Sequence, residues 1–267
     1  MFKPKKSLGQ SFLISSRIAD RLVSALELKN TDSVLEIGAG KGILTKRIAE
    51  KANKVFAVEL DKRLIPILES NTKRFSNVEI INADILQLDW SNWEKVKIIG
   101  NIPYNLSSPI LFRLLDNINL WEITVLTLQR EFADRLLAKP GTKDYGALSV
   151  IFEPLTIRKK LITIPASAFQ PKPKVISTAI IIQKRIPALF NDIPYDIFNK
   201  LVHIAFSHRR KTIANNLNLG LSLDKIKISQ IAEKTGIDLT RRAEQLTVDE
   251  FYQLAQALYK KRFLTQS

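Results

Sequence analysis

The chain has 267 residues, of which 45% are hydrophobic and 25% charged, a balance typical of a globular chain with one large domain and a smaller companion. It contains no cysteine, which excludes disulfides, thiolate metal sites and cysteine nucleophiles. A formal charge of +15 and an isoelectric point near 9.9 favour a nucleic-acid partner, because binding releases phosphate counterions. Generic solubility is the alternative, although it requires far less imbalance.

Metal sites and membrane segments are not indicated by the sequence. The only histidines, His203 and His208, do not have the i, i+4 spacing of a helical metal site. No apolar run approaches the roughly 18 residues that span a membrane. The basic residues 1–7 are not followed by the apolar segment of a signal peptide. We expect no metal, no membrane partner and a cytoplasmic location.

Basic residues recur in short clusters along the chain, which indicates a broad phosphate-binding face rather than one tail. For Arg209, Arg210 and Lys211, a solvated helix face without a partner is an equally good interpretation. The clusters are Lys3, Lys5 and Lys6, then Arg158, Lys159 and Lys160, then Lys172 and Lys174, and finally Arg209, Arg210 and Lys211.

In chain order, the first predicted helix covers residues 17–28, with apolar positions on one stripe. The stretch Asp32–Leu44 then predicts a buried strand, a glycine turn and the start of a helix. Its glycines, Gly38, Gly40 and Gly42, would let a flat ligand lie against the backbone without meeting a Cβ atom.

The spacing of these glycines fits neither of two common phosphate sites. A dinucleotide fingerprint places its third glycine one residue later. A Walker loop requires Ser or Thr after Gly-Lys, and here Lys41 is followed by Gly42. The alternative to ligand binding is that the glycines only form a tight turn after the strand.

Two further strand-like runs end in acids. Val55–Leu60 carries Glu59, about twenty residues beyond the glycine turn, where a carboxylate can accept both hydroxyls of a ribose. Val78–Ala83 is followed by Asp84, which could accept from an adenine amino group. Helical stretches at 44–51 and 62–75 separate the runs, so we predict right-handed βαβ units with a ligand at the carboxyl ends of the strands.

A fourth run, Val96–Gly100, leads into Asn101-Ile-Pro-Tyr104. The glycine pattern, the two acids and this turn resemble the S-adenosylmethionine-dependent methyltransferases that modify the exocyclic nitrogen of adenine. Three more stretches match, at 6–13, 169–175 and 205–212. Together they resemble the KsgA/RsmA family of ribosomal RNA adenine dimethyltransferases across nearly the whole chain.

The remaining elements complete a predicted two-domain organisation. We predict a helix at Ser108–Leu115, a strand at Ile123–Leu128, a helix at Arg130–Ala138 and strands at Leu148–Phe152 and Thr178–Ile182. The total of seven strands is typical of the family's α/β fold, a Rossmann-like class I methyltransferase with a mostly parallel sheet whose last pair is usually an antiparallel hairpin. We therefore predict a catalytic domain at 1–184.

After Lys184 the composition shifts. Arg185–Pro194 contains two prolines and predicts a linker. The segment 185–267 predicts a small all-α, RNA-recognising domain with N-caps at Ser222 and Thr247. Its predicted helices are Tyr195–Phe206, Asp224–Thr235 and Val248–Arg262.

The resemblance implies S-adenosyl-L-methionine as cofactor and assigns residues to it. Residues 10–13 would lie at the entrance of the glycine site, although Ser11 stands where the family usually has Asn or His. The implied cofactor-binding residues are Ser11, Leu13, Gly38, Gly40, Glu59, Asp84 and Asn101.

The resemblance also implies how the base is held. The Asn101 side-chain oxygen and a backbone oxygen at Ile102 or Pro103 would accept the hydrogens of adenine N6. Tyr104 and Phe169 would stack on a base swung out of its helix. Locally, Phe169 could be an ordinary core residue, and Asn101 could be a turn residue bonded to its own backbone.

The activity that the resemblance implies is dimethylation of two adjacent adenines near the 3′ end of small-subunit (16S) ribosomal RNA, in a 30S assembly intermediate; we expect a monomer. Lys5, Lys6, Lys172, Lys174 and Arg209–Lys211 would bind the RNA. The alternatives are an enzyme that methylates one adenine of large-subunit RNA, a DNA adenine methylase, which more often carries Asn- or Asp-Pro-Pro-Tyr, and a non-enzymatic RNA-binding factor that retains the fold.

Overall fold

A computed structural model describes residues 4–5, 9–190 and 192–264. The predicted RNA-binding Lys6 lies outside the described residues. Cα packing divides the chain into two compact units, one of residues 1–133 with 157–184 and one of residues 134–156 with 185–267. Residues 134–156 therefore pack with the C-terminal part of the chain, and the predicted domain division after Lys184 stays a prediction.

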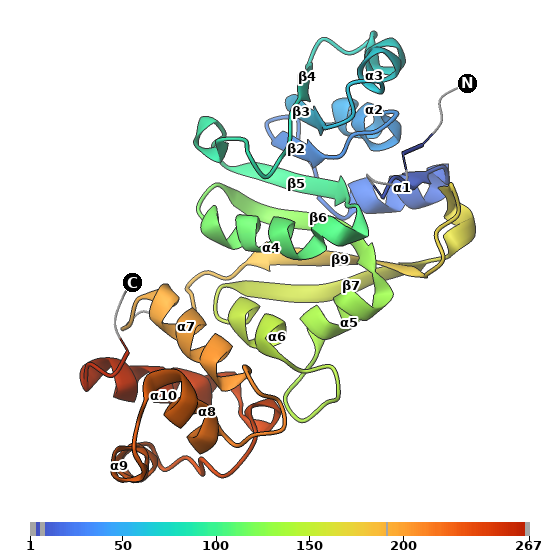
Figure 1. Ribbon diagram of the computed structural model, residues 1–267. Coiled ribbons are helices and arrows are strands. Elements are labelled where there is room, and N and C mark those ends of the chain that lie inside the picture. Colours follow the sequence, from blue (N-terminus) through green and yellow to red (C-terminus); the bar gives the residue numbers. More distant parts are fainter. Residues whose placement is uncertain (1–3, 6–8, 191, 265–267) are drawn as a thin grey trace. The chain divides into compact units, whose positions relative to one another are not determined.

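The first unit is built on a seven-stranded sheet with the order β4-β3-β2-β5-β6-β9-β7. The strands from β4 to β6 are parallel, whereas β9 is antiparallel to β6 (Figure 1). The predicted fold class is confirmed. The strands are β2 (Ser33–Ile37), β3 (Lys54–Glu59), β4 (Val78–Asn82), β5 (Val96–Asn101), β6 (Trp121–Gln129), β7 (Thr156–Ile164) and β9 (Ser177–Lys184).

Strand β2 has β3 on one side and β5 on the other. From β2 the chain adds β3 and β4 toward one edge of the sheet, and it then returns to add β5 and β6 toward the other edge. Such a switch point opens a crevice at the carboxyl ends of the strands. The helices of this unit are α1 (Ser16–Ser24), α2 (Ile43–Ala49), α3 (Ile65–Thr72) and α4 (Ser107–Asp116). Buried Leu22 of α1 and Ile48 of α2 share one apolar core with Val34 and Val125 of the sheet, which holds the glycine turn on a rigid base.

One predicted strand was wrong, and one strand of the seven-stranded sheet was missed. Leu148–Phe152 belongs to helix α6 (Ala147–Phe152), because a short apolar run that is fully buried has no periodicity to separate helix from strand. Strand β7 was missed because exposed Lys159 and Lys160 interrupt its apolar pattern. Strand β7 is an edge strand of the sheet. Lysines on an edge strand discourage pairing with the strands of other chains.

The second unit is helical beyond Lys184. Its helices there are α7 (Tyr195–Ala205), α8 (Ile213–Leu221), α9 (Lys225–Thr235) and α10 (Val248–Lys260), while α5 (Arg130–Leu137) begins in the first unit and ends in the second. The N-cap at Thr247 is confirmed, with Thr247 and Glu250 forming a capping box. Among the described residues, none of these helices is long and apolar enough to cross a membrane.

The predicted N-cap at Ser222 was wrong. Ser222 ends α8 with φ 54°, and the cap of α9 is Asp224, whose carboxylate accepts the Lys227 N–H at 2.8 Å. Helix α8 was missed because its Asn-Asn-Leu-Asn-Leu-Gly sequence is rich in poor helix formers.

Candidate active site

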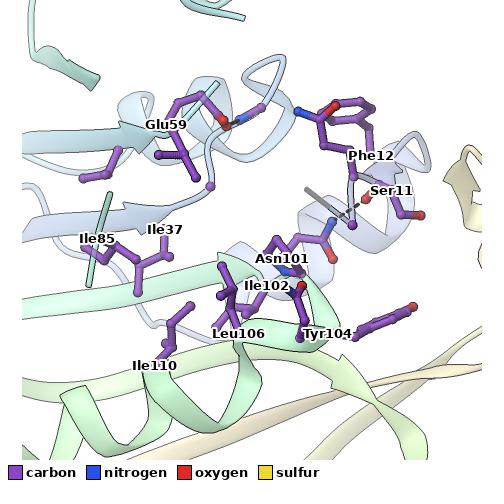
Figure 2. Close-up of a pocket in the computed structure, with 18 of the residues that line it drawn as sticks. Ser11, Phe12, Ile37, Glu59, Ile85, Asn101, Ile102, Tyr104, Leu106 and Ile110 are labelled. Carbon is purple, nitrogen blue, oxygen red and sulfur yellow. Dashed lines mark hydrogen bonds between the residues drawn. The ribbon is translucent and has the colours of Figure 1, made fainter. Parts of the chain in front are cut away.

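A cavity opens at the carboxyl ends of β2, β3 and β5 (Figure 2). Five buried or half-buried apolar side chains form one wall of it, which suits a flat purine ring. They are Ile37, Ile85, Ile102, Leu106 and Ile110.

The cavity brings together nearly all of the predicted site residues. It is lined by Ser11, Gly38, Gly40, Glu59, Asp84, Asn101, Tyr104 and Phe169. Leu13 is the exception, because its side chain is buried and lines a smaller neighbouring recess with Glu36 and Gly40.

The glycine turn needs glycine for two different reasons. Gly40 has φ 58°, and a Cβ atom there would lie 3.2 Å from the Phe12 ring. Gly42 has φ 83° and precedes α2, and a Cβ atom there would lie 2.9 Å from Leu68 Cδ1. Gly42, whose early position does not match a dinucleotide fingerprint, is thus the N-cap residue of α2.

Glu59 is fixed by two backbone groups. Gly40 N–H donates to one carboxylate oxygen and Asp61 N–H to the other, each at 2.8 Å. The residue is 7% exposed. Burial raises the pKa of Glu59 in spite of these bonds. Each carboxylate oxygen has a second lone pair, so Glu59 can still accept two hydroxyl groups from a ligand.

Glu36, on β2, is a second buried acid that sequence reasoning did not single out. It is 1% exposed, and its Oε2 atom has no hydrogen-bond partner among the described residues. Burial raises the pKa of Glu36 to about 8, and the charge of Glu59 adds to the shift. At neutral pH the Glu36 carboxyl group is therefore largely protonated.

Replacing Glu36 with glutamine should remove a pH dependence of stability. The pKa of about 8 lies above the ordinary value of 4.5, so between these values the folded state holds a proton that the unfolded state has released. Wild-type stability should fall with rising pH across this window by on the order of a few kcal/mol. Thermal unfolding from pH 5 to 8.5 checks this: Glu36→Gln should flatten the slope, and exposed Glu79→Gln should not. Equal slopes in all three proteins would contradict the assignment.

Asn101 ends β5 and points toward the N-terminal segment (Figure 2). Its Nδ2 atom donates to the backbone carbonyl of Ser11 at 2.8 Å. This bond fixes the amide plane and leaves Oδ1 as the acceptor face. The partner of this bond lies far away in the sequence, so the bond does not support the alternative that Asn101 is a turn residue bonded to its own backbone.

Ser11 uses its main chain and its side chain differently. The carbonyl accepts from Asn101, whereas the hydroxyl donates to the carbonyl of Pro171 at 2.8 Å. The contact with Asn101 therefore does not depend on the residue type at position 11, where the chain departs from the usual family pattern.

The two predicted stacking residues are held in different ways. Tyr104 lines the cavity, and its hydroxyl forms a 2.8 Å hydrogen bond with the buried Ser177. Phe169 is 4% exposed, lies in the core with Leu13, and lines the cavity as well. It is brought there by a two-stranded sheet of β1 (Phe12–Leu13) and β8 (Phe169–Gln170). The core and stacking interpretations of Phe169 are therefore compatible, and stacking stays a prediction.

Asp84 lies at the cavity in a tight turn. Its Oδ1 atom accepts the N–H of Leu86 at 2.9 Å, which orients the carboxylate. The described residues contain no group of three or more His, Asp or Glu side chains that could hold a metal ion.

The predicted RNA-binding residues within the described chain are exposed. Lys5, Lys172 and Lys174 belong to the first unit, and Arg209, Arg210 and Lys211 lie between α7 and α8 in the second. The Arg209 guanidinium lies 3.5 Å from a carboxylate oxygen of Glu244. Their contacts with RNA stay predictions.

Comparisons with known proteins show the family of the chain. A family model described as "Ribosomal RNA adenine dimethylase" matches residues 1–260. The chain is 41% identical to "Ribosomal RNA small subunit methyltransferase A" of Alkaliphilus oremlandii, over 97% of this chain and 93% of the relative. It is 38% identical to the protein of that name from Natranaerobius thermophilus, over 97% and 92% of the two chains.

Two solved structures resemble the whole chain. A dimethyladenosine transferase from Plasmodium falciparum has a TM-score of 0.81 and 26% identity, covering 95% of this chain and 99% of that one. The 23S rRNA methyltransferase ErmE has a TM-score of 0.74 and 25% identity, with coverage of 93% and 99%. The resemblance in the motifs is confirmed, and the chain belongs to the ribosomal RNA adenine dimethylase family.

Proposed function

We propose that this protein uses S-adenosylmethionine to methylate, twice each, the N6 amino groups of two adjacent adenines near the 3′ end of small-subunit ribosomal RNA. One observation supports it above others: the carboxylate of Glu59 and the oriented amide of Asn101 line the same cavity. A ribose-binding acid and an amine-binding amide at one strand edge allow donor and acceptor to meet.

The cavity offers the groups that binding of S-adenosylmethionine would require. Glu59 retains acceptor capacity for the ribose hydroxyls, and Gly40 keeps the space beside the Phe12 ring that a Cβ atom would fill. Asp84 is oriented to accept from the adenine amino group, and the carbonyl of Ser11 is fixed nearby. S-adenosylmethionine would supply an electrophilic methyl group on a sulfonium.

Asn101 supports the chemistry by orienting the acceptor nitrogen. Adenine N6 is a weak nucleophile because its lone pair is delocalised into the ring. If Asn101 Oδ1 and a backbone carbonyl accept its two hydrogens, the nitrogen becomes pyramidal and its lone pair is aimed at the methyl group. The Pro103 carbonyl already accepts the Leu106 N–H at 2.9 Å, which favours Ile102 for the second contact. No strong base is required, because the methylated nitrogen loses its proton readily to water.

Tyr104 should contribute through its ring and not through its hydroxyl. We expect Tyr104→Ala to weaken use of the RNA substrate by about 10- to 100-fold, because base stacking is worth roughly 1–3 kcal/mol. Tyr104→Phe keeps the ring and loses only the hydrogen bond to Ser177, so it should stay within about tenfold of wild type. Ser177→Ala should match it, and the double variant should be no worse. Steady-state KM and kcat with small subunits check this; equal losses for Ala and Phe would contradict stacking.

The choice of small-subunit RNA is supported by the relatives. Those at about 40% identity carry the name "Ribosomal RNA small subunit methyltransferase A", whereas the 23S rRNA methyltransferase ErmE is 25% identical. We propose an assembly intermediate of the small subunit as the partner, which places the activity in the cytoplasm. The exposed Lys172, Lys174 and Arg209–Lys211 would bind its phosphates.

The test is to incubate the protein with labelled S-adenosylmethionine and undermethylated small subunits, and then to map the modified bases. We expect label on two neighbouring adenines near the 3′ end. Label on large-subunit RNA would favour the ErmE-like activity, and no label at all would favour a binding factor without enzymatic activity.

A further inference from the structure

Three hydrogen bonds tie residues 10 and 11 to separate parts of the first unit. Asn101 Nδ2 donates to the Ser11 carbonyl, and Ser11 Oγ donates to the Pro171 carbonyl, both at 2.8 Å. The third bond joins Gln10 Nε2 to Asp61 Oδ2, also at 2.8 Å. Because Gly9, Gln10, Ser11 and Phe12 all line the cavity, these bonds set the position of one of its walls.

Asp61 connects this wall to Glu59. The residue is 5% exposed, and its backbone N–H donates to Glu59 Oε1 at 2.8 Å. Its carboxylate receives Arg63 Nε at 2.9 Å and Nη2 at 2.6 Å, besides Gln10. The Arg63 guanidinium holds the pKa of Asp61 well below its usual range, so Asp61 is ionised at neutral pH. One residue thus contacts both the proposed ribose acid and the N-terminal wall.

The amide of Gln10 suits this position. Its Oε1 atom accepts the backbone N–H of Lys5 at 2.7 Å, while its Nε2 atom donates to Asp61. A carboxylate at position 10 could accept from Lys5 but would place a second negative charge against Asp61 Oδ2. Glutamate has nearly the same shape as glutamine, so Gln10→Glu changes little but the charge and the donor, and it breaks the contact with Asp61.

We propose that Gln10 and Asp61 are positioning residues for the methyl donor, holding residues 9–12 against the cofactor cavity while Asp61 N–H holds Glu59. This inference rests on the proposed function. The pair acts on cofactor retention and not on the transfer step, because Ser11, the residue that bonds to Asn101, keeps its own bond to Pro171. Loosening it should raise KM for S-adenosylmethionine and leave kcat nearly unchanged.

The test compares Gln10→Glu and Gln10→Ala in the full-length protein. Product binding is measured by calorimetry with S-adenosylhomocysteine, and KM and kcat with small subunits. We expect Gln10→Glu to weaken product binding and to raise the cofactor KM by about tenfold or more, since hydrogen bonds to charged groups are the strong ones. We expect a smaller rise for Gln10→Ala and kcat within about threefold of wild type for both.

Two controls separate positioning from general damage. Gln183→Glu makes the same chemical change on β9, outside the cavity, and should behave as wild type. The double variant Gln10→Glu with Asp61→Asn removes the contact between two carboxylates, while Arg63 loses one of its two acceptor oxygens. It should recover at least part of the lost affinity relative to Gln10→Glu alone.

The outcomes are distinguishable. Product binding by both Gln10 variants within twofold of wild type, or a loss confined to kcat, would overturn the inference while the proposed function stands. If the wild-type protein neither bound S-adenosylhomocysteine nor methylated ribosomal RNA, the proposed function would fail and the inference with it.

Discussion

Replacing Asn101 with alanine should reduce methyl transfer by about 10²- to 10³-fold, the usual effect of losing one oriented polar group at a reacting centre. The side chain would no longer accept from adenine N6, and the Ser11 carbonyl would lose its 2.8 Å contact. Cofactor binding should fall by only about tenfold, since one hydrogen bond is lost there. Binding to undermethylated small subunits should be unchanged. Single-turnover transfer at saturating cofactor, with filter binding of the particles, separates these effects.

Asn105→Ala is the matched control for this prediction. Asn105 belongs to the same turn and lines the same cavity, but it is exposed and lies beyond the strand end. It should retain transfer within about threefold, as expected for a surface substitution. Equal loss of transfer and of particle binding in Asn101→Ala would remove Asn101 from the chemistry. Transfer as weak in Asn105→Ala as in Asn101→Ala would show a general effect of the turn.

Replacing Glu59 with alanine removes one carboxylate and should therefore lower both the cofactor affinity and the stability of the protein. Cofactor affinity should fall by about 100-fold, because two hydroxyl contacts to a charged acceptor are lost. The free energy of unfolding should fall by about 1–3 kcal/mol, because the buried N–H groups of Gly40 and Asp61 lose their acceptors. Calorimetry with S-adenosylhomocysteine and urea unfolding measure the two effects.

Glu79→Ala on the neighbouring strand β4 is the control. Glu79 is exposed and its carboxylate lies 2.9 Å from Lys54 Nζ, so its removal should change the free energy of unfolding by less than about 1 kcal/mol and leave cofactor affinity intact. If Glu59→Ala bound the cofactor as tightly as Glu79→Ala, Glu59 would be only a structural acid that organises the glycine turn.

The parts of the fold that sequence reasoning predicted are those with local signals. Each parallel strand from β2 to β5 is a short apolar run whose end is marked by glycine, acid or Asn101, so type and position could be inferred together. Strand β7 and helix α8 carry no such mark. Their exposed lysines and their asparagines hide the periodicity, and burial against other elements decides their conformation.

The site was predicted as a set of residue types and not as a network. Gln10 meets Asp61 across 51 positions, Tyr104 meets Ser177 across 73, and Asn101 meets Ser11 across 90. No local pattern relates residues so far apart, because their meeting depends on the order of strands in the sheet. The motif resemblance supplied Asn101 and Tyr104, whereas their bonds to Ser11 and Ser177 became visible only in three dimensions.

The bond from Asn101 to position 11 has a practical consequence for protein engineering. Its acceptor is a peptide oxygen, and every genetically encoded amino acid carries that atom, proline included. A saturation library at position 11 would therefore keep the acceptor atom for the Asn101 amide while it varies the cavity lining and the attachment to Pro171. This makes position 11 a suitable first place to adapt the enzyme to donors with larger alkyl groups.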